Sequence, residues 1–414
     1  MTRILTLTNL YPPHAYGGYE MSCDDVMRRL AGRGHEVTVL TTTTRVAGVA
    51  DPPGDDTRVR RELEWYWQDH ELRSPHPARR LAMERRNQRR LRRLLDECRP
   101  DVVSVWNMGA MSLGLLRTVA ARKIPMVYAV CDEWPVYGVH LDAWGRLFAG
   151  RPRLARVVEL TARVPCRLSD LGQTGAFCFV SEHTREACRR GSPFSFPLST
   201  VVHSGIEPSE FPAPAVVDQP WQGRLLYVGR LDERKGILTA VDALSELPED
   251  VTLRYVGRGD AEGAIRARAA ASGVLHRIRI DAVPRADLAP LYREADALLF
   301  TSEWDEPFGL TPIEAMACGT PVIGTATGGS ASFLIDEVTC LRYPPGDAVA
   351  LADRVRRLAA DPELRRRLTV GGRQVADELT VDRLADTFAA WHEAAAAGYP
   401  AGPPPDRELE LLRR

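Results

Sequence analysis

The sequence predicts an α/β protein built from two doubly wound domains, each a parallel β-sheet covered by helices on both faces. Short apolar runs of strand length alternate with longer segments of helical periodicity, an order typical of parallel sheets. The alternation stops once, at a proline-rich stretch over residues 208–220, and then begins again. Because 414 residues provide room for two cores, we expect functional residues in the loops at the carboxyl ends of both sets of strands.

Composition restricts the partners that the chain can have. The formal net charge of -1 gives no support to a nucleic-acid partner. Apolar runs fall short of the roughly 20 residues that a membrane span needs, and the N-terminus lacks a signal-peptide pattern. The eight cysteines show no Cys-x-x-Cys spacing, which favours free thiols over a structural zinc site. We therefore expect a cytoplasmic protein without membrane contact, as a monomer or a homo-oligomer.

Lysine is nearly absent from the chain. Of the 54 Lys and Arg residues, only Lys123 and Lys235 are lysine. An excess of arginine is typical of a GC-rich genome, such as an actinobacterial one. A lysine that persists in such a chain indicates a position where a compact point charge is needed.

The first domain, predicted over residues 1–205, begins with a βαβ unit. A strand over residues 4–9 leads into a loop with Gly17 and Gly18, and a helix then connects it to a strand over residues 37–40. The glycine pair lies at the carboxyl end of the first strand, where it could face a phosphate or make a tight turn. It does not match the Gly-x-Gly-x-x-Gly pattern, so we expect no bound NAD or FAD.

An irregular insertion is predicted over residues 44–77. Its aromatic cluster, Trp65, Tyr66 and Trp67, could stack on an acceptor or could pin the loop to the core. The helix expected over residues 79–93 carries eight arginines. Such a helix can lie on an anionic membrane, but in so arginine-rich a chain the pattern favours a solvated face.

The rest of the first domain contributes an acidic pair at a strand end. Further strands are predicted over residues 102–106, 126–130, 177–180 and 200–202. The second of these runs into Cys131, Asp132 and Glu133. The two carboxylates could orient or deprotonate an acceptor, or they could form a solvated pair in a loop.

The second domain is predicted over residues 222–380, after a linker over residues 206–221. Its expected strands cover residues 225–228, 251–256, 278–283, 297–300 and 322–323. Helical patterns fill the gaps and continue to residue 397. We expect residues 381–400 to form a helix that returns to the first domain, and residues 401–414 to form a peripheral tail.

Two cations follow the first strand of the second domain. The segment Gly-Arg-Leu-Asp-Glu-Arg-Lys-Gly at residues 229–236 places Arg230 and Lys235 at its carboxyl end. A charged surface turn is one interpretation, and the scarcity of lysine favours a phosphate site. Gly257 again puts flexible backbone at a strand end. No Asp-x-Asp occurs, so the charge of a bound diphosphate would have to be met by Arg230, Lys235 and helix N-termini.

Two glutamates follow the strand over residues 297–300. Glu306 and Phe308 lie where that strand ends. Thr311 and a proline then begin a helix, and Glu314 stands three residues after Thr311. This spacing matches a capping box, which needs no ligand. A ligand contact is the alternative for both glutamates.

Five patterns together resemble glycosyltransferase family 4, a family of retaining enzymes with the GT-B fold. The patterns are Gly-Gly at 17–18, Gly-His-Glu-Val at 34–37, the segment at 229–236, the two glutamates at 306 and 314, and Ala-Met-Ala-Cys-Gly-Thr-Pro-Val at 315–322. The resemblance covers roughly residues 4–395. It implies two Rossmann-like domains that face a cleft, with an acceptor on the first domain and a nucleotide-diphosphate sugar mainly on the second.

The resemblance also implies roles for single residues. Arg230 and Lys235 would hold the diphosphate, and Glu306 would bind the hydroxyls of the transferred sugar. Glu314 would bind the ribose. The residues expected to contact the donor, with Val283 against the base, are Gly17, Gly18, Gly229, Gly257, Val283, Phe308, Gly309, Leu310, Thr311 and Glu314. Transfer would be a front-face attack in which a leaving phosphate oxygen takes the acceptor's proton, without a metal or any other cofactor.

The sequence departs from the family pattern at Cys131. Many members have a histidine before the aspartate at this strand end, and a thiol cannot replace the hydrogen bonds of imidazole to the sugar. Asp132 is the nearest substitute and completes the expected catalytic set. A thiol acceptor, with a reference pKa of about 8.5, would need little help with deprotonation.

We expect the donor to be UDP-, GDP- or dTDP-linked and the acceptor to be a small soluble molecule, such as a secondary metabolite in antibiotic biosynthesis. The alternatives are a thiol acceptor, a lipid or polysaccharide acceptor, and a nucleotide-sugar epimerase of the same fold. An inactive scaffold is a further alternative.

Overall fold

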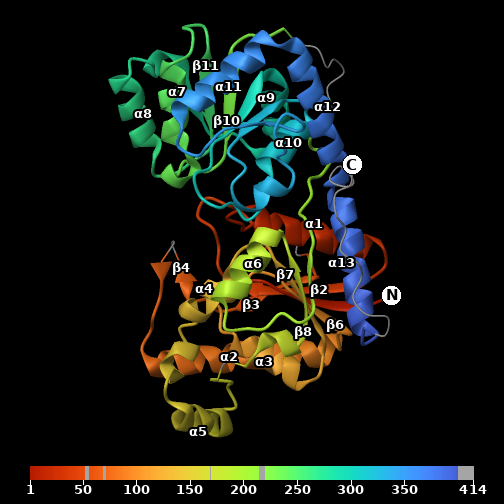
Figure 1. Cartoon of the computed structure of the whole chain (residues 1–414). Helices are drawn as coiled ribbons and strands as arrows, with labels where there is room; N and C mark the ends of the chain where they lie inside the picture. Colours follow the sequence, from red (N-terminus) through yellow and green to blue (C-terminus); the bar gives the residue numbers. More distant parts are fainter. Residues whose placement is uncertain (52–55, 69–70, 168, 214–219, 400–414) are drawn as a thin grey trace. The chain divides into compact units, whose positions relative to one another are not determined.

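A computed structural model describes residues 1–51, 56–68, 71–167, 169–213 and 220–399. The chain divides into two compact units (Figure 1). Within the described residues, unit 1 consists of Met1–His203 and Leu384–Tyr399, and unit 2 consists of Ser204–Arg383.

Unit 1 is built on a parallel sheet. Among its described residues, seven strands pair in the order β3-β2-β1-β6-β7-β8-β9. The strands are β1 (Arg3–Leu7), β2 (Glu36–Thr42), β3 (Val59–Leu63), β6 (Val102–Val105), β7 (Met126–Val130), β8 (Gly175–Phe179) and β9 (Ser199–Val201). The order reverses between β1 and β6, which makes their carboxyl ends the switch point of the sheet.

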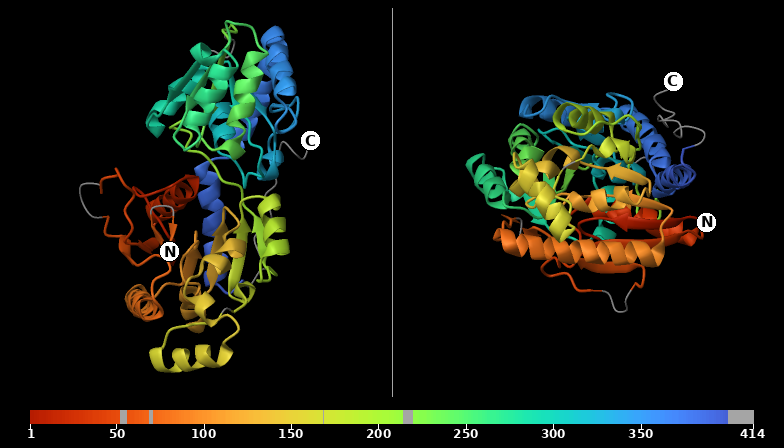
Figure 2. Two further views of the ribbon diagram at one scale, coloured as in Figure 1. Left: turned by 90° about the vertical axis from the view of Figure 1, so that its left-hand side faces the viewer. Right: turned by 90° about the horizontal axis from the view of Figure 1, so that it is seen from below.

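Helices cover both faces of this sheet (Figures 1 and 2). They are α1 (Gly18–Gly32), α2 (Pro77–Cys98), α3 (Gly114–Ala121), α4 (Trp134–Leu141), α5 (Pro152–Ala162) and α6 (Glu182–Gly191). Leucines of α2 and α3 pack on one face. Apolar side chains of α1 pack on the other, together with those of α13 (Val381–Ala396), whose Phe388 ring lies 5.2 Å from the Trp106 ring. The short helix α5 lies outside the α2–α3 layer.

Unit 2 repeats the architecture. Its strands pair in parallel in the order β12-β11-β10-β13-β14-β15 within the described chain. They are β10 (Arg224–Val228), β11 (Thr252–Val256), β12 (Ile278–Asp281), β13 (Ala297–Phe300), β14 (Val322–Gly324) and β15 (Leu341–Arg342). The switch point lies between β10 and β13, so the loops that follow these two strands are where a ligand site is expected.

The helices of unit 2 are α7 (Ile237–Ser245), α8 (Glu262–Ala271), α9 (Leu288–Glu294), α10 (Thr311–Ala317), α11 (Ala348–Ala360) and α12 (Pro362–Glu378). Apolar residues of α7, α8, α11 and α12 form one core with the strands. The predicted fold, two doubly wound parallel-sheet domains, is confirmed.

The prediction that residues 44–77 form an irregular insertion was wrong in one respect, because part of this segment forms strands. It contains β3, which pairs with β2 at the edge of the sheet, and a short hairpin of β4 (Trp67–Gln68) and β5 (Glu71–Leu72). Strand β3 was not predicted because its sequence, Val-Arg-Arg-Glu-Leu, has an apolar residue only at each end. An edge strand buries less side-chain area, so it needs no continuous apolar run.

The arginines of α2 are not simply a solvated face. Arg86 binds both carboxylate oxygens of Glu64, at 2.6 and 2.8 Å, and Arg90 and Arg93 reach Glu64 and Glu62 of the segment around β3. These contacts tie the helix to the edge of the sheet. None of the described helices combines the length and the apolar character that crossing a membrane requires.

Candidate active site

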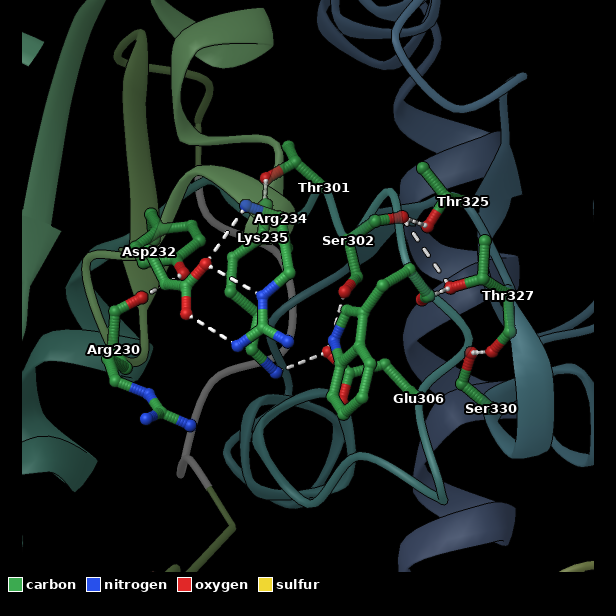
Figure 3. A network of polar contacts seen from close by, with 12 residues as sticks. Arg230, Asp232, Arg234, Lys235, Thr301, Ser302, Glu306, Thr325, Thr327 and Ser330 are labelled. Atoms are coloured by element: carbon green, nitrogen blue, oxygen red, sulfur yellow. Dashed lines mark hydrogen bonds and ion pairs between the residues drawn. The ribbon is translucent and has the colours of Figure 1, made fainter. Parts of the chain in front are cut away.

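The loop after β10 is held rigidly against the loop after β13. A 3₁₀ turn, η3 (Glu233–Lys235), begins at Asp232, whose carboxylate accepts from the backbone N–H of Arg234 and also from its guanidinium, at 2.8 Å. The Thr301 hydroxyl donates to the carbonyl of Lys235 at 2.6 Å (Figure 3). These hydrogen bonds hold the backbone of the loop and thereby orient the side chain of Lys235.

Lys235 points at Glu306. Its Nζ lies 2.5 Å from Glu306 Oε1, and the Ser302 hydroxyl donates to the same oxygen at 2.6 Å (Figure 3). The Lys235 ammonium also lies 5.2 Å from the centre of the Trp304 ring. Glu306 is only 5% exposed. A carboxylate buried to this degree needs such partners, since removing an unpaired charge from water is costly.

Arg230, five positions earlier, is placed differently. Its side chain is exposed, and within the described residues its guanidinium has no hydrogen-bond partner. Only its backbone is fixed, because the Tyr227 hydroxyl donates to the Arg230 carbonyl at 2.9 Å. Figure 3 shows the guanidinium pointing away from Asp232. Arg230 is thus a cation with free donors beside the Lys235–Glu306 pair.

Glu314 belongs to a second network. Its Oε1 accepts from Arg285 at 2.7 Å and its Oε2 from the Tyr292 hydroxyl at 2.8 Å. The carboxylate is 2% exposed. Arg285 also pairs with Glu210 at 2.9 Å and lies 5.1 Å from the Phe211 ring. A ribose hydroxyl would have to share Glu314 with these donors or replace one of them.

The capping-box interpretation of Thr311 and Glu314 was wrong. Helix α10 begins at Thr311 itself with Leu310 as N-cap, and no side chain of the described residues caps it. The carboxylate of Glu314 is taken by donors from other parts of the chain, so it cannot return to the helix start.

The other residues expected near a donor lie at strand ends or helix starts. Gly229 follows β10, Val283 follows β12 and is half-buried, and Gly309 and Leu310 precede α10. The side chain of Phe308 is buried 5.1 Å from the Phe333 ring, so only its backbone can face a ligand.

Gly257 is explained by packing alone. Its N–H donates to the Asp281 carbonyl at 2.8 Å, and a Cβ at this position would lie 1.8 Å from the Gly229 carbonyl oxygen. The backbone at Gly229, directly after β10, therefore requires a glycine at position 257. Nothing in this geometry requires a ligand.

Gly17 is not explained by packing. Its backbone is extended, with φ -171°, and a Cβ there would meet nothing within 4 Å among the described residues. Gly18 is the first residue of α1. The Gly17 N–H donates to Glu20 Oε2 at 3.0 Å. Burial raises the pKa of Glu20, and the charge of Asp132 raises it further.

Asp132 is held at the end of β7. Its Oδ1 accepts from the Trp134 N–H at 2.9 Å and its Oδ2 from the Tyr137 hydroxyl at 2.7 Å. Burial raises the pKa of Asp132 to about 6, against the lowering effect of the Tyr137 hydrogen bond. The neighbouring Cys131 is half-buried, and Glu133 is exposed. Asp132 is therefore a carboxylate that changes charge close to neutral pH.

The structure thus brings Lys235 into contact with Glu306 and places Arg230 in the same loop, while Glu314 lies in a separate network. Gly17, Gly18 and Asp132 belong to unit 1. Sequence reasoning missed Arg285 and Tyr137, which bind the predicted carboxylates. The only available signal was that each stands a few residues after a predicted strand.

Two family models match the chain. The model "Glycosyltransferase Family 4" matches residues 16–210, and "Glycosyl transferases group 1" matches residues 220–375. Together they span both units.

Individual relatives are similar over different lengths. A D-inositol 3-phosphate glycosyltransferase from Xylanimonas cellulosilytica is 37% identical over 186 residues, which are 44% of this chain and 41% of the relative. This chain therefore matches less than half of that relative's length. A glycogen synthase from Mycobacterium tuberculosis is 29% identical over 90% of this chain and 89% of the relative.

Solved structures show the same fold. Sucrose-phosphate synthase from Thermosynechococcus elongatus superposes with a TM-score of 0.71 at 23% identity, over 96% of this chain and all of that chain. Anabaena HepE in complex with UDP superposes with a TM-score of 0.67 at 17% identity, over 94% and 98% of the two chains.

Proposed function

Because this chain belongs to glycosyltransferase family 4 and has the GT-B fold, we propose that it is a retaining glycosyltransferase that moves a sugar from a nucleotide-diphosphate sugar to a small soluble acceptor. The observation that carries this proposal is the position of the Lys235–Glu306 pair. Both residues lie in the loops after β10 and β13, at the switch point of the sheet in unit 2. Ligands of doubly wound sheets bind at this place.

The two cations of the β10 loop suit a leaving diphosphate. As the bond between sugar and phosphate breaks, negative charge grows on the phosphate oxygens and positive charge on the sugar ring. Arg230 has free donors, and Lys235 is a compact charge whose present partner is Glu306. Preorganised cations near developing negative charge lower the barrier because they need not reorient during the reaction.

The carboxylates suit hydroxyl groups. Glu306, one of whose oxygens is occupied by Lys235 and Ser302, is proposed to accept hydrogen bonds from the transferred sugar. Glu314 is proposed to bind the ribose, next to the loop of Val283 on which the base would lie. We propose that transfer needs no metal, since the sequence has no Asp-x-Asp pair and the diphosphate charge is met by Arg230, Lys235 and backbone N–H groups near Gly309.

In the proposed reaction the acceptor attacks the face from which the diphosphate leaves. The new bond forms to the anomeric carbon, the old bond to the phosphate oxygen breaks, and the acceptor's proton passes to that oxygen. The configuration is retained without a covalent enzyme intermediate. Asp132, which follows Cys131 at the end of β7, is proposed to accept a hydrogen bond from the sugar or the acceptor.

The ionisation of Asp132 should make turnover depend on pH. Because the proposed role needs the ionised carboxylate, and burial raises its pKa to about 6, turnover should fall on the acid side with an apparent pKa of about 6. Tyr137→Phe removes a hydrogen bond that favours the carboxylate, so the fall should move to higher pH. The measurement is kcat in both proteins between about pH 5 and 8. Identical profiles would contradict this role.

The proposed role of Gly17 at a phosphate can be tested by comparing alanine substitutions at Gly17 and Gly257. Gly17→Ala should leave the melting temperature unchanged, since the backbone is extended and the space is open, and should lower kcat/KM by on the order of tenfold or more if a phosphate approaches. Gly257→Ala should instead lower the free energy of unfolding, by about 2 kcal/mol or more, because its Cβ would collide with a carbonyl. Full activity in Gly17→Ala would leave Gly17 as a simple turn residue.

The proposal is tested by a thermal-shift panel of UDP-, GDP- and dTDP-sugars, followed by incubation of the best donor with and without candidate acceptors. We expect one nucleotide to stabilise the protein and the sugar to move only when an acceptor is present. A change in the sugar without an acceptor would indicate the epimerase alternative. An acceptor screen that compares alcohols with thiols separates O- from S-transfer.

A further inference from the structure

Unit 1 contains a cavity of about 750 Å³ whose lining includes none of the candidate active-site residues. Its walls come from the segments that follow β1, β2 and β3, at Tyr16, residues 43–47 and residues 64–67, and from the chain that leads into α2. Three neighbouring parallel strands thus direct their carboxyl ends at one space, which is where doubly wound sheets bind ligands. The volume is in the range of small-molecule sites, roughly 300–1,000 Å³.

One wall of the cavity is aromatic and fixed. Trp65 donates its indole N–H to the Gly109 carbonyl at 2.9 Å, and the Tyr66 hydroxyl donates to Glu84 at 2.8 Å. Trp67 stands beside them and is half-buried. Rings held in this way present flat apolar surface at little cost in conformational entropy, which suits a planar or apolar ligand skeleton.

The charge of the cavity is positive. Four arginines line it, at positions 45, 73, 79 and 86, against the single carboxylate of Glu64. The Arg86 fork binds both oxygens of Glu64 and lowers the pKa of that carboxyl, so the two charges cancel. Arg45 is paired with Asp51 at 2.9 Å.

Arg73 also has an interaction partner, so Arg79 is the cation that remains. It is exposed on the first turn of α2, and its guanidinium has no hydrogen-bond partner in the part of the chain that the structure describes. A guanidinium fork binds carboxylate or phosphate through two parallel hydrogen bonds. The cavity therefore offers one free anion-binding group next to a fixed aromatic wall.

The aromatic wall is connected by a chain of contacts to Asp132, the carboxylate proposed to act in transfer. Trp65 is anchored on Gly109, and a Cβ at Gly109 would lie 3.1 Å from the Tyr137 ring. The Tyr137 hydroxyl in turn donates to Asp132. On another side, Tyr16 directly precedes Gly17. Of the segments proposed to act in transfer, the Gly17 segment thus reaches the cavity wall at Tyr16, and the Asp132 segment is connected to that wall through Tyr137, Gly109 and Trp65.

We propose that this cavity binds the acceptor, and that the acceptor carries an anionic group, a carboxylate or a phosphate, which binds Arg79, beside a flat ring system that lies against Trp65 and Trp67. This inference rests on the proposed function, because it takes the second substrate of a glycosyltransferase as the occupant. It adds the chemical class of the acceptor.

The test uses three probes of nearly one shape: 4-hydroxybenzoate, 4-hydroxyphenyl phosphate and the neutral 4-hydroxybenzamide. Each is titrated calorimetrically into the full chain, its Arg79→Gln variant and its Arg85→Gln variant. Arg85 is an exposed arginine of the same helix that does not line the cavity, and it is the matched control. A nucleotide-sugar titration into the same samples reports on unit 2.

We expect an anionic probe to bind at least roughly tenfold more tightly than the neutral one, and Arg79→Gln to remove that preference while Arg85→Gln preserves it. Comparison of the carboxylate with the phosphate identifies the preferred anion. Equal binding of all probes, no binding of any probe, or an anion preference that survives in Arg79→Gln would overturn the inference. If the preference depends on Arg79 but no nucleotide sugar binds, the proposed function fails and the anion site stands.

Discussion

Lys235→Arg is expected to lower kcat by on the order of 10²-fold, although it conserves the positive charge. The ammonium lies 2.5 Å from the Glu306 carboxylate and 5.2 Å from the centre of the Trp304 ring. A guanidinium is larger, planar and branched, so it cannot occupy this space and still present a point charge to a phosphate. Steady-state kinetics with the donor found by thermal shift measures the effect.

The chain provides its own control for this prediction. Lys123, the other lysine, is exposed in the turn after α3, and Lys123→Arg should leave kcat unchanged. Turnover at the normal rate in Lys235→Arg would show that the scarcity of lysine has no bearing on Lys235 and that its pairing with Glu306 is structural.

Substitutions of Glu306 and Glu314 should have different effects on turnover and on nucleotide binding. Glu306→Gln replaces a charged partner of Lys235 by a neutral amide, and if Glu306 binds the transferred sugar, kcat should fall by on the order of 10²-fold while nucleotide affinity changes little. Glu314→Gln should instead weaken nucleotide binding by on the order of tenfold. Calorimetric titration of the nucleoside diphosphate, together with kcat, separates the two effects.

A control is needed because Glu314 also holds its surroundings together. Its carboxylate accepts from Arg285 and Tyr292, so the amide of Glu314→Gln would present a donor to one of these donors and the free protein would lose stability. Melting temperatures without ligand show how much of the affinity loss is structural. If Glu306→Gln loses nucleotide affinity and Glu314→Gln loses turnover, the two assignments are exchanged.

The alternation of strands and helices was visible in the sequence because the central strands β6, β7, β13 and β14 are fully buried and therefore read as apolar runs. Strands β7 and β13 are examples, with every residue buried. The edge strand β3 escaped prediction because its central residues are charged. Sequence patterns thus reveal these buried strands and also the edge strands β9 and β12, and they miss an edge strand with a charged centre.

The residues of the candidate site were identifiable, but their partners were not. Lys235 and Glu306 each stand at a strand end, yet 71 positions separate them, and only the order of strands brings β10 next to β13. Arg285 reaches Glu314 across 29 positions. At Gly257, which was predicted to contact the donor, the packing of neighbouring backbone by itself accounts for the glycine, and the ligand contact stays a prediction.

We propose above all that Arg230 and Lys235 bind a nucleotide-diphosphate sugar in unit 2. Calorimetric titration of the best donor from the thermal-shift panel into the wild type and the Arg230→Gln/Lys235→Met double variant tests it directly. We predict saturable binding to the wild type and a loss of at least on the order of 10²-fold in affinity in the variant, with an unchanged melting temperature of the free protein for the Arg230→Gln change alone. Equal affinity in both proteins, or no donor binding to the wild type, would contradict the claim.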